Sequence, residues 1–171
     1  MDTTLARTLL LDVFDRFAEG ISESVTDLDE DALRWRPAPD ANPIGWIAWH
    51  VLRVQDDHLA ELGGVQQAWF AQGWQERFAL PYDEDAHGYG QSADEVSAWR
   101  GTADHLAGYA ADVHALTRRV LVKLSDYERV VDESYDPPVT AASRLVSVVN
   151  EVNQHLGQIA YLRGMLPNGP A

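Results

Sequence analysis

The segment TAASRLVSVVNEVNQHLGQIAYLRGML, residues 140–166, has the clearest pattern in the chain. Its apolar side chains recur at alternating steps of four and three residues, the spacing that places them along one face of an α-helix. The residues of this face are Ala141, Leu145, Val148, Val152, His155, Ile159, Leu162 and Leu166. The pattern predicts a long helix that packs against other helices, with His155 as the one polar side chain on its buried face.

Glu151 lies one turn before His155 on this predicted helix. Residues four apart on a helix are about 40° apart around the axis, with Cβ atoms roughly 6 Å apart. The carboxylate and the imidazole can therefore address one point. Such a pair beside an apolar face indicates half of a metal site.

Length and composition limit the class of protein. At 171 residues and 46% hydrophobic, the chain has the size and apolar content of one domain, which we expect to span residues 1–171. Its 27 acidic and 13 basic residues give a formal net charge of -14. Nucleic acids and anionic membranes are bound by clustered lysines and arginines, so neither is an expected partner.

The chain contains no cysteine. Disulfides, thiolate ligands and a cysteine nucleophile are therefore excluded, and a site must be built from His, Asp and Glu. The first residues include Asp2, Asp12 and Asp15, where a signal peptide would be cationic and then apolar. No apolar run is long enough to span a bilayer. These features predict a soluble cytoplasmic protein.

Helical patterns and their boundary residues predict four long helices. The second helix is introduced by Asn42 as the cap and Pro43 as the first helical residue, and the third by a capping box of Ser92 and Glu95. The expected helices cover about residues 4–25, 43–63, 92–124 and 140–166.

Two long connections join these helices. Residues 65–91 are irregular and aromatic, with short helical pieces expected at 66–70 and 74–78. Residues 125–139 could pair briefly as extended chain, although a loop is the main expectation. Four amphipathic helices without a credible sheet predict an all-α protein, a four-helix bundle with long connections.

Two histidines compete for the inward position on the second helix. His50 lies at the margin of its apolar stripe, and His58 lies on the stripe itself, four residues after Val54. Helical bundles build metal sites in the core from side chains on facing helices. Either histidine could therefore meet Glu151 and His155.

The motifs NPIGWIAWH, residues 42–50, and NEVNQHLGQIAYLRG, residues 150–164, resemble those of the DinB-like (YfiT-like) metalloprotein superfamily. Its members are four-helix bundles with a divalent metal held by three side chains. Many relatives have a histidine where this chain has Glu151. A His, Glu, His set is similar to that of mycothiol-dependent maleylpyruvate isomerase and the related mycothiol S-transferases. The resemblance implies that His50, Glu151 and His155 are the metal ligands, and that the protein is a homodimer.

Two imidazoles and one carboxylate form a zinc-type catalytic set with an open position, although Ni²⁺, Fe²⁺ or Mn²⁺ also accept such ligands. A bound ion would hold a thiol as its thiolate. We therefore expect a metal-dependent thiol S-transferase, or a thiol-dependent isomerase. Its small-molecule partners would be mycothiol and an electrophile.

Other side chains are candidates for supporting roles. Arg53 and Arg163 are placed to hold a substrate carboxylate or sugar hydroxyl, although both could be surface charges and Arg163 could serve the end of its helix. Asp57 and Gln158 could orient the ligands through hydrogen bonds. Trp46, Trp49 and Tyr161 are candidate pocket walls, or ordinary packing residues.

Two other functions fit the same residues. In the first, the metal activates water and the protein is a hydrolase, but with Glu151 as a ligand only Asp57 is left as a carboxylate base. In the second, the protein is a non-catalytic metal-binding bundle. Metal analysis distinguishes the second from the enzymes, and a thiol-conjugation assay distinguishes the enzymes from each other.

Overall fold

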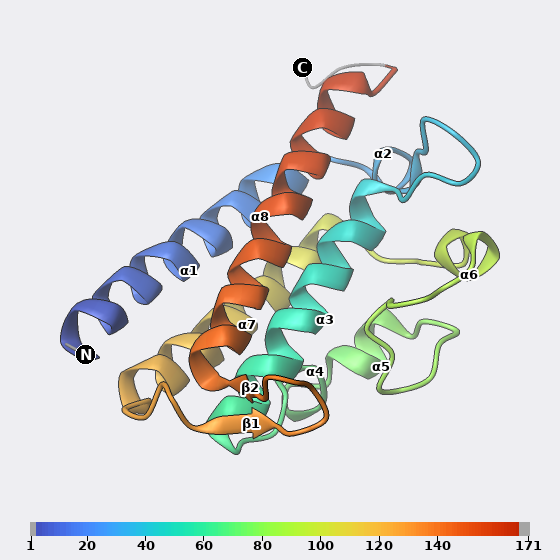
Figure 1. Ribbon diagram of the computed structural model, residues 1–171. Coiled ribbons are helices and arrows are strands. Elements are labelled where there is room, and N and C mark those ends of the chain that lie inside the picture. Colours follow the sequence, from blue (N-terminus) through green and yellow to red (C-terminus); the bar gives the residue numbers. More distant parts are fainter. Residues whose placement is uncertain (1–2, 168–171) are drawn as a thin grey trace.

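Four long helices form the frame of the protein in a computed structural model that describes residues 3–167 (Figure 1). Both α1 and α3 pack against α7 and α8, which closes the bundle around a common core. The prediction of an all-α four-helix bundle is confirmed. The four helices are α1 (Thr3–Val25), α3 (Ile44–Gly63), α7 (Ala103–Lys123) and α8 (Ala141–Met165).

The remaining elements are short and lie in the connections. Figure 1 shows α4 beside the C-terminal end of α3, with α5 farther along the connection that leads to α6. These elements are α2 (Glu30–Arg34), α4 (Ala68–Ala71), α5 (Trp74–Phe78), α6 (Ala93–Ser97), β1 (Val130–Asp132) and β2 (Val139–Thr140). The helical pieces predicted in the aromatic connection therefore correspond to α4 and α5.

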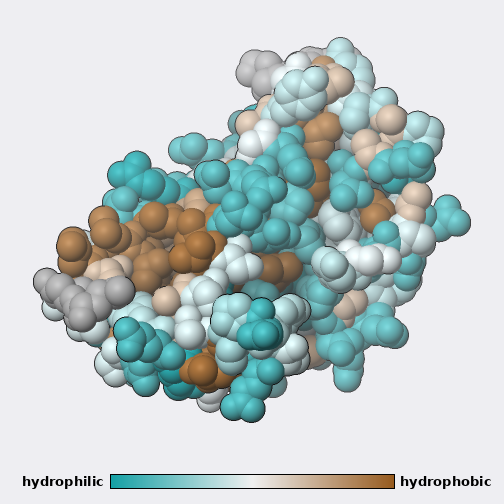
Figure 2. All heavy atoms as spheres, in the orientation of Figure 1, coloured by the Kyte–Doolittle hydropathy of each residue, from teal (hydrophilic) through white to brown (hydrophobic). Residues whose placement is uncertain are grey.

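The apolar faces predicted from the sequence form the core. On α8, six apolar residues of the predicted face are buried, whereas His155 is only partly buried. Figure 2 shows hydrophilic side chains over much of one side of the molecule, and exposed apolar side chains over the first half of α1. Leu9 in that region is 59% exposed. No helix within residues 3–167 is long and apolar enough to cross a bilayer.

The helix predicted over residues 92–124 is wrong as a single element, because it is divided into α6 and α7. The capping box of Ser92 and Glu95 is present, but α6 ends after Ser97. A second cap follows, in which the Thr102 side chain accepts a hydrogen bond from the His105 amide and starts α7. The interruption lets Trp99 turn inward, where it is 1% exposed.

One helix boundary and one connection also differ from the main expectation. Helix α3 begins at Ile44, and Pro43, rather than Asn42, occupies the cap position without a side-chain cap hydrogen bond. The connection over residues 125–139 is not only a loop: it leads into a short antiparallel pair, the alternative expected from the sequence, in which Val130 lies opposite Thr140. Thr140 then caps α8 through a capping box with Ser143.

Candidate metal centre

Three polar side chains converge between α3 and α8. Nε2 of His50 lies 3.1 Å from Oε1 of Glu151, and Nε2 of His155 lies 3.0 Å from the same oxygen. The three potential ligand atoms all lie within 4.8 Å of one another. The structure thus brings together the three residues that the family resemblance implied.

The local structure explains this convergence. Glu151 and His155 lie one turn apart on α8, so their spacing is fixed by the helix. His50 comes from α3, which packs directly against α8. His58, the alternative ligand, instead has Nδ1 3.6 Å from Asp57 Oδ2. The packing of α3 therefore turns His50, and not His58, toward the pair on α8.

The Nδ1 atom of His50 contacts the backbone carbonyl oxygen of His87. A carbonyl oxygen only accepts hydrogen bonds, so Nδ1 must carry the proton and donate it. In the neutral imidazole this leaves Nε2 with a lone pair, and that lone pair faces Glu151. The turn that contains His87 thus sets the tautomer that a metal ligand requires.

His155 is arranged in the same way by its own helix. Its Nδ1 lies 2.7 Å from Oε1 of Gln158, one turn further along α8. The amide oxygen accepts the Nδ1 proton and leaves Nε2 with its lone pair directed toward Glu151. Gln158 therefore lies where the sequence analysis expected a residue that orients the ligand.

With both Nδ1 atoms protonated, no proton lies between the two Nε2 atoms and the Glu151 carboxylate. Two imidazole lone pairs face one carboxylate oxygen at 3.0–3.1 Å, and a neutral imidazole has no second proton to place between them. Burial lowers the pKa of His50, since the charged imidazolium is disfavoured there. A divalent cation can bind both Nε2 lone pairs and the carboxylate oxygen at once, so these three ligand atoms fit such an ion.

Aromatic rings enclose the His50 side of the group. The Trp46 ring stacks on the His50 imidazole with centroids 5.0 Å apart and an angle of 12° between the planes. Trp46 is itself fixed by a 2.8 Å hydrogen bond from Nε1 to Gln91 Oε1. Trp49 lies next to Trp46, with centroids 6.3 Å apart. Both tryptophans are almost fully buried, at 5% and 1% exposure, so they pack around the α3 side of the group.

Arg53 does not lie where a substrate could reach it. Its side chain is buried, and it donates hydrogen bonds to backbone carbonyls and to other side chains of the protein. The expectation that Arg53 contacts substrate is therefore not met. Its hydrogen bonds join α3 to other parts of the protein.

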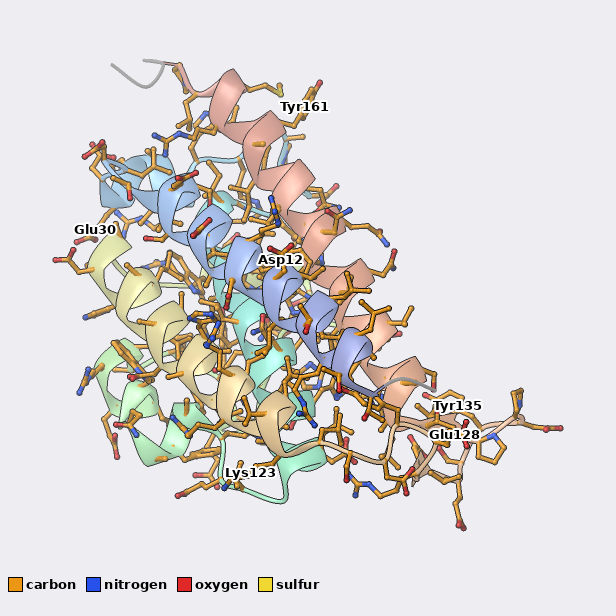
Figure 3. The ribbon with its side chains drawn as sticks, turned by 90° about the vertical axis from the view of Figure 1, so that its left-hand side faces the viewer. Asp12, Glu30, Lys123, Glu128, Tyr135 and Tyr161 are labelled. Carbon is orange, nitrogen blue, oxygen red and sulfur yellow. The ribbon has the colours of Figure 1, made fainter. Side chains whose placement is uncertain are left out.

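Three other candidates also lie away from the group. Asp57 accepts a 2.7 Å hydrogen bond from Gln67 Nε2 rather than supporting His50. Arg163 donates to the carbonyls of Ser24 and Thr26 at the end of α1, at 3.0 and 2.9 Å. Tyr161 is 72% exposed and points outward from α8 (Figure 3). Its position, six residues after His155, is about 120° around the helix.

Sequence reasoning missed the segment that covers His50. In the turn DEDAHGYG, residues 83–90, His87 supplies the carbonyl described above and Gly88 is buried against the site. The two glycines were the local sign of this turn, since glycine readily adopts positive φ angles. Gly88 and Gly90 have φ angles of 95° and 75°.

The fold and this group of side chains define the class: an all-α bundle with two imidazoles and a carboxylate gathered between facing helices. A family model described as Mycothiol-S-transferase matches residues 9–167. The chain therefore belongs to the mycothiol S-transferase family, which confirms the DinB-like resemblance.

A solved structure has the same fold over nearly the whole chain. It is described as the conserved protein of locus from Enterococcus faecalis, and is 27% identical in sequence with a TM-score of 0.85. The alignment covers 94% of this chain and 96% of that one. A search of curated proteins found no match.

Proposed function

We propose that the protein is a metal-dependent thiol S-transferase that activates mycothiol for attack on an electrophilic carbon. The observation that carries this proposal is the convergence of two imidazole Nε2 atoms on one oxygen of Glu151, with both Nδ1 atoms already engaged. Membership of the mycothiol S-transferase family supports the choice of thiol.

The proposed ligands are His50, Glu151 and His155, and Zn²⁺ is the proposed ion because this donor set is typical of catalytic zinc. A bound divalent ion supplies Lewis acidity that keeps a thiol deprotonated near neutral pH. The three side chains carry one negative charge in total, so the loaded site keeps a net positive charge that favours an anionic thiolate.

The chain's own groups position and shield this site. The His87 carbonyl and the Gln158 amide hold both imidazoles in the tautomer that presents Nε2. Trp46 covers one face of the His50 ring and excludes water from it. The half-exposed side of the group, where the Glu151 side chain is 34% exposed, is the side from which we expect thiol and electrophile to enter.

The hydrolase alternative has less support. It depended on Asp57 as the base that activates water, and the Asp57 carboxylate is engaged by Gln67 instead. We therefore keep hydrolysis only as an outcome of the test below.

Elemental analysis of protein purified without immobilised nickel tests the metal site. We expect about one equivalent of metal in the parent and much less in Glu151→Gln. Loss of a residue that only orients a ligand typically lowers metal affinity by about 10–100-fold, so loss of the ligand itself should lower it by roughly 100-fold or more. The matched control is Glu128→Gln, an exposed residue on the connection between α7 and β1 (Figure 3), which should keep its metal. Equal metal content in all three proteins would show that Glu151 is not a metal ligand.

A conjugation assay tests the reaction. Metal-loaded parent protein should accelerate the reaction of mycothiol with a chromogenic aryl halide, and Glu151→Gln should lose the acceleration. If the loaded protein turns over an ester substrate but leaves the thiol reaction at its background rate, the protein is a hydrolase and not a thiol transferase.

A further inference from the structure

Arg53 lies one turn after His50 on α3 and is fully buried, at 0% exposure. A guanidinium has five N–H groups, and Arg53 makes four hydrogen bonds. Its Nη1 donates to Gln67 Oε1 at 2.8 Å and to the Tyr109 hydroxyl at 3.3 Å. Such a residue is fixed in place and unavailable to a ligand.

The charge of Arg53 is balanced within the same cluster. Asp56, also fully buried, has Oδ2 3.8 Å from Arg53 Nη1. Asp56 accepts from the amides of Ala68 and Trp69 at 2.8 and 2.7 Å, and from the Tyr109 hydroxyl at 2.8 Å. These bonds tie α3 to α4 and α7, so the guanidinium is held on a rigid base.

The other side of the guanidinium faces the turn that covers the candidate metal centre. Arg53 Nε donates to the carbonyl of Ala86 at 3.1 Å, and Nη2 donates to the carbonyl of Asp85 at 3.4 Å. The next carbonyl along the chain, that of His87, accepts from Nδ1 of His50. Two side chains of one helix thus hold three successive carbonyl groups of this turn.

Other hydrogen bonds also support this segment: the Ala86 amide donates to the Asp83 carbonyl at 2.9 Å, and Trp69 Nε1 donates to the Glu84 carbonyl at 3.0 Å. Neither of these bonds holds a carbonyl group of residues 85–87. The turn lies between α5 and α6, in a stretch without helix or strand. The His87 carbonyl can direct the His50 tautomer only while the peptide groups before it keep their orientation. From these contacts we infer that Arg53 is a positioning residue for the metal centre: it holds the 85–87 carbonyls so that His50 is kept as the Nδ1–H tautomer with Nε2 free for an ion.

The inference rests on the proposed function only for its link to a metal, because the tautomer of His50 can be measured without one. The first experiment is ¹⁵N NMR of the histidine side chains in chelator-treated protein. Parent protein should show His50 as a single neutral tautomer protonated at Nδ1. In Arg53→Lys, a positive charge stays near Asp56 but the planar fork is lost, so His50 should show signals averaged between both tautomers.

The second experiment is a competition titration with Zn²⁺ and a chromogenic chelator. Residues that orient a metal ligand typically change affinity by about 10–100-fold, so we expect a weakening of this size in Arg53→Lys. Thr117→Val is the matched control. Thr117 is buried on α7 and accepts a hydrogen bond from Gln55, which lies on α3 like Arg53, and the bond does not involve the turn. The Zn²⁺ affinity of this variant should stay within about twofold of the parent, and its His50 tautomer should not change.

Each result decides a separate question. If the parent binds Zn²⁺ and Arg53→Lys binds it equally well with an unchanged tautomer, the inference fails and the metal site stands. If the parent binds no Zn²⁺, the proposed function fails, and the NMR comparison alone decides the inference.

A measurement on the parent covers the case in which Arg53→Lys does not fold. The Arg53 Nε–H should exchange slowly with solvent and show a through-hydrogen-bond coupling to the Ala86 carbonyl. Fast exchange without coupling would show that the guanidinium does not hold the turn, and would overturn the inference.

Discussion

Gly88 lies so close to His50 that a Cβ atom built on this glycine would be 2.9 Å from Nδ1 of the imidazole. The same atom would be 2.8 Å from Cζ2 of Trp46 and 3.2 Å from Cζ3 of Trp49. Position 88 is therefore restricted to glycine by space as well as by its φ of 95°. The close approach is what allows the neighbouring carbonyl to reach Nδ1.

Gly88→Ala is expected to displace the turn from His50 and to weaken Zn²⁺ binding by about 10-fold or more, the effect of losing a contact that orients a ligand. It should also cost roughly 1–3 kcal/mol of stability through backbone strain. Gly90→Ala is the control, because Gly90 has a similar φ of 75° but open space around its Cβ position. Comparable Zn²⁺ titrations for the two variants would argue against a role for this turn.

The stability of the metal-free protein should fall as the pH is lowered below about 6.5, the ordinary pKa of histidine. Burial lowers the pKa of both His50 and His58. Between 6.5 and the lower folded-state pKa, the unfolded chain binds more protons than the folded one, so stability is lost as pH falls through that interval. Each histidine contributes at most about 1.4 kcal/mol per pH unit.

Urea unfolding at pH 7.5 and 5.5 with a chelator measures this effect. His58→Gln should reduce the difference between the two pH values, because one of the two contributions is removed. His114→Gln, a partly exposed histidine on α7 paired with Asp15, serves for comparison. An unchanged pH difference in His58→Gln would mean that folding does not lower the pKa of this imidazole.

Gly45→Ala should destabilise the protein by about 1–3 kcal/mol, as expected for overpacking. A Cβ atom at this position would overlap the six-membered ring of Trp99, which is packed onto the start of α3. Gly157→Ala on α8 should instead stabilise the protein by up to about 1 kcal/mol, since it relieves the helix of a glycine and has open space around it. Thermal unfolding of both variants measures the contrast, and equal shifts would contradict the placement of Trp99.

Arg163→Gln should cost about 1 kcal/mol of stability and leave Zn²⁺ affinity unchanged. The reason is that Arg163 joins the end of α8 to two carbonyls at the end of α1, and does not approach His155. Arg16→Gln, which removes an exposed pair with Asp12, should cost less than about 0.5 kcal/mol. A loss of thiol-conjugation activity in Arg163→Gln with normal stability would restore its candidacy as a substrate contact.

The long helices could be predicted because their information is local. Apolar periodicity and caps mark α8 from Ala141 to Met165 to within one residue at each end. The spacing of Glu151 and His155 follows from the same helix. The choice between His50 and His58 could not be made from α3 alone, because it depends on how α3 is rotated against α8.

Features that depend on distant contacts were not predictable. Arg53 looked like a surface charge or a substrate contact because the groups that satisfy it come from α7 and from the segment 67–86. The break between α6 and α7 was hidden because Val96 and Trp99 continue the apolar period of α7 while packing elsewhere. The Gly101–Thr102 pair was the local sign of that break, a glycine followed by a capping residue.

The contact between His50 and Glu151 joins positions 101 residues apart in the chain. An ion shared by them would act as a reversible cross-link that closes a long loop, and permanent links of about this span are worth roughly 4–5 kcal/mol in the chain-entropy view. Gain or loss of the ion would therefore be felt by the whole bundle rather than by the site alone. The melting temperature should then serve as a gauge of occupancy, rising with free metal concentration and falling when a chelator is added.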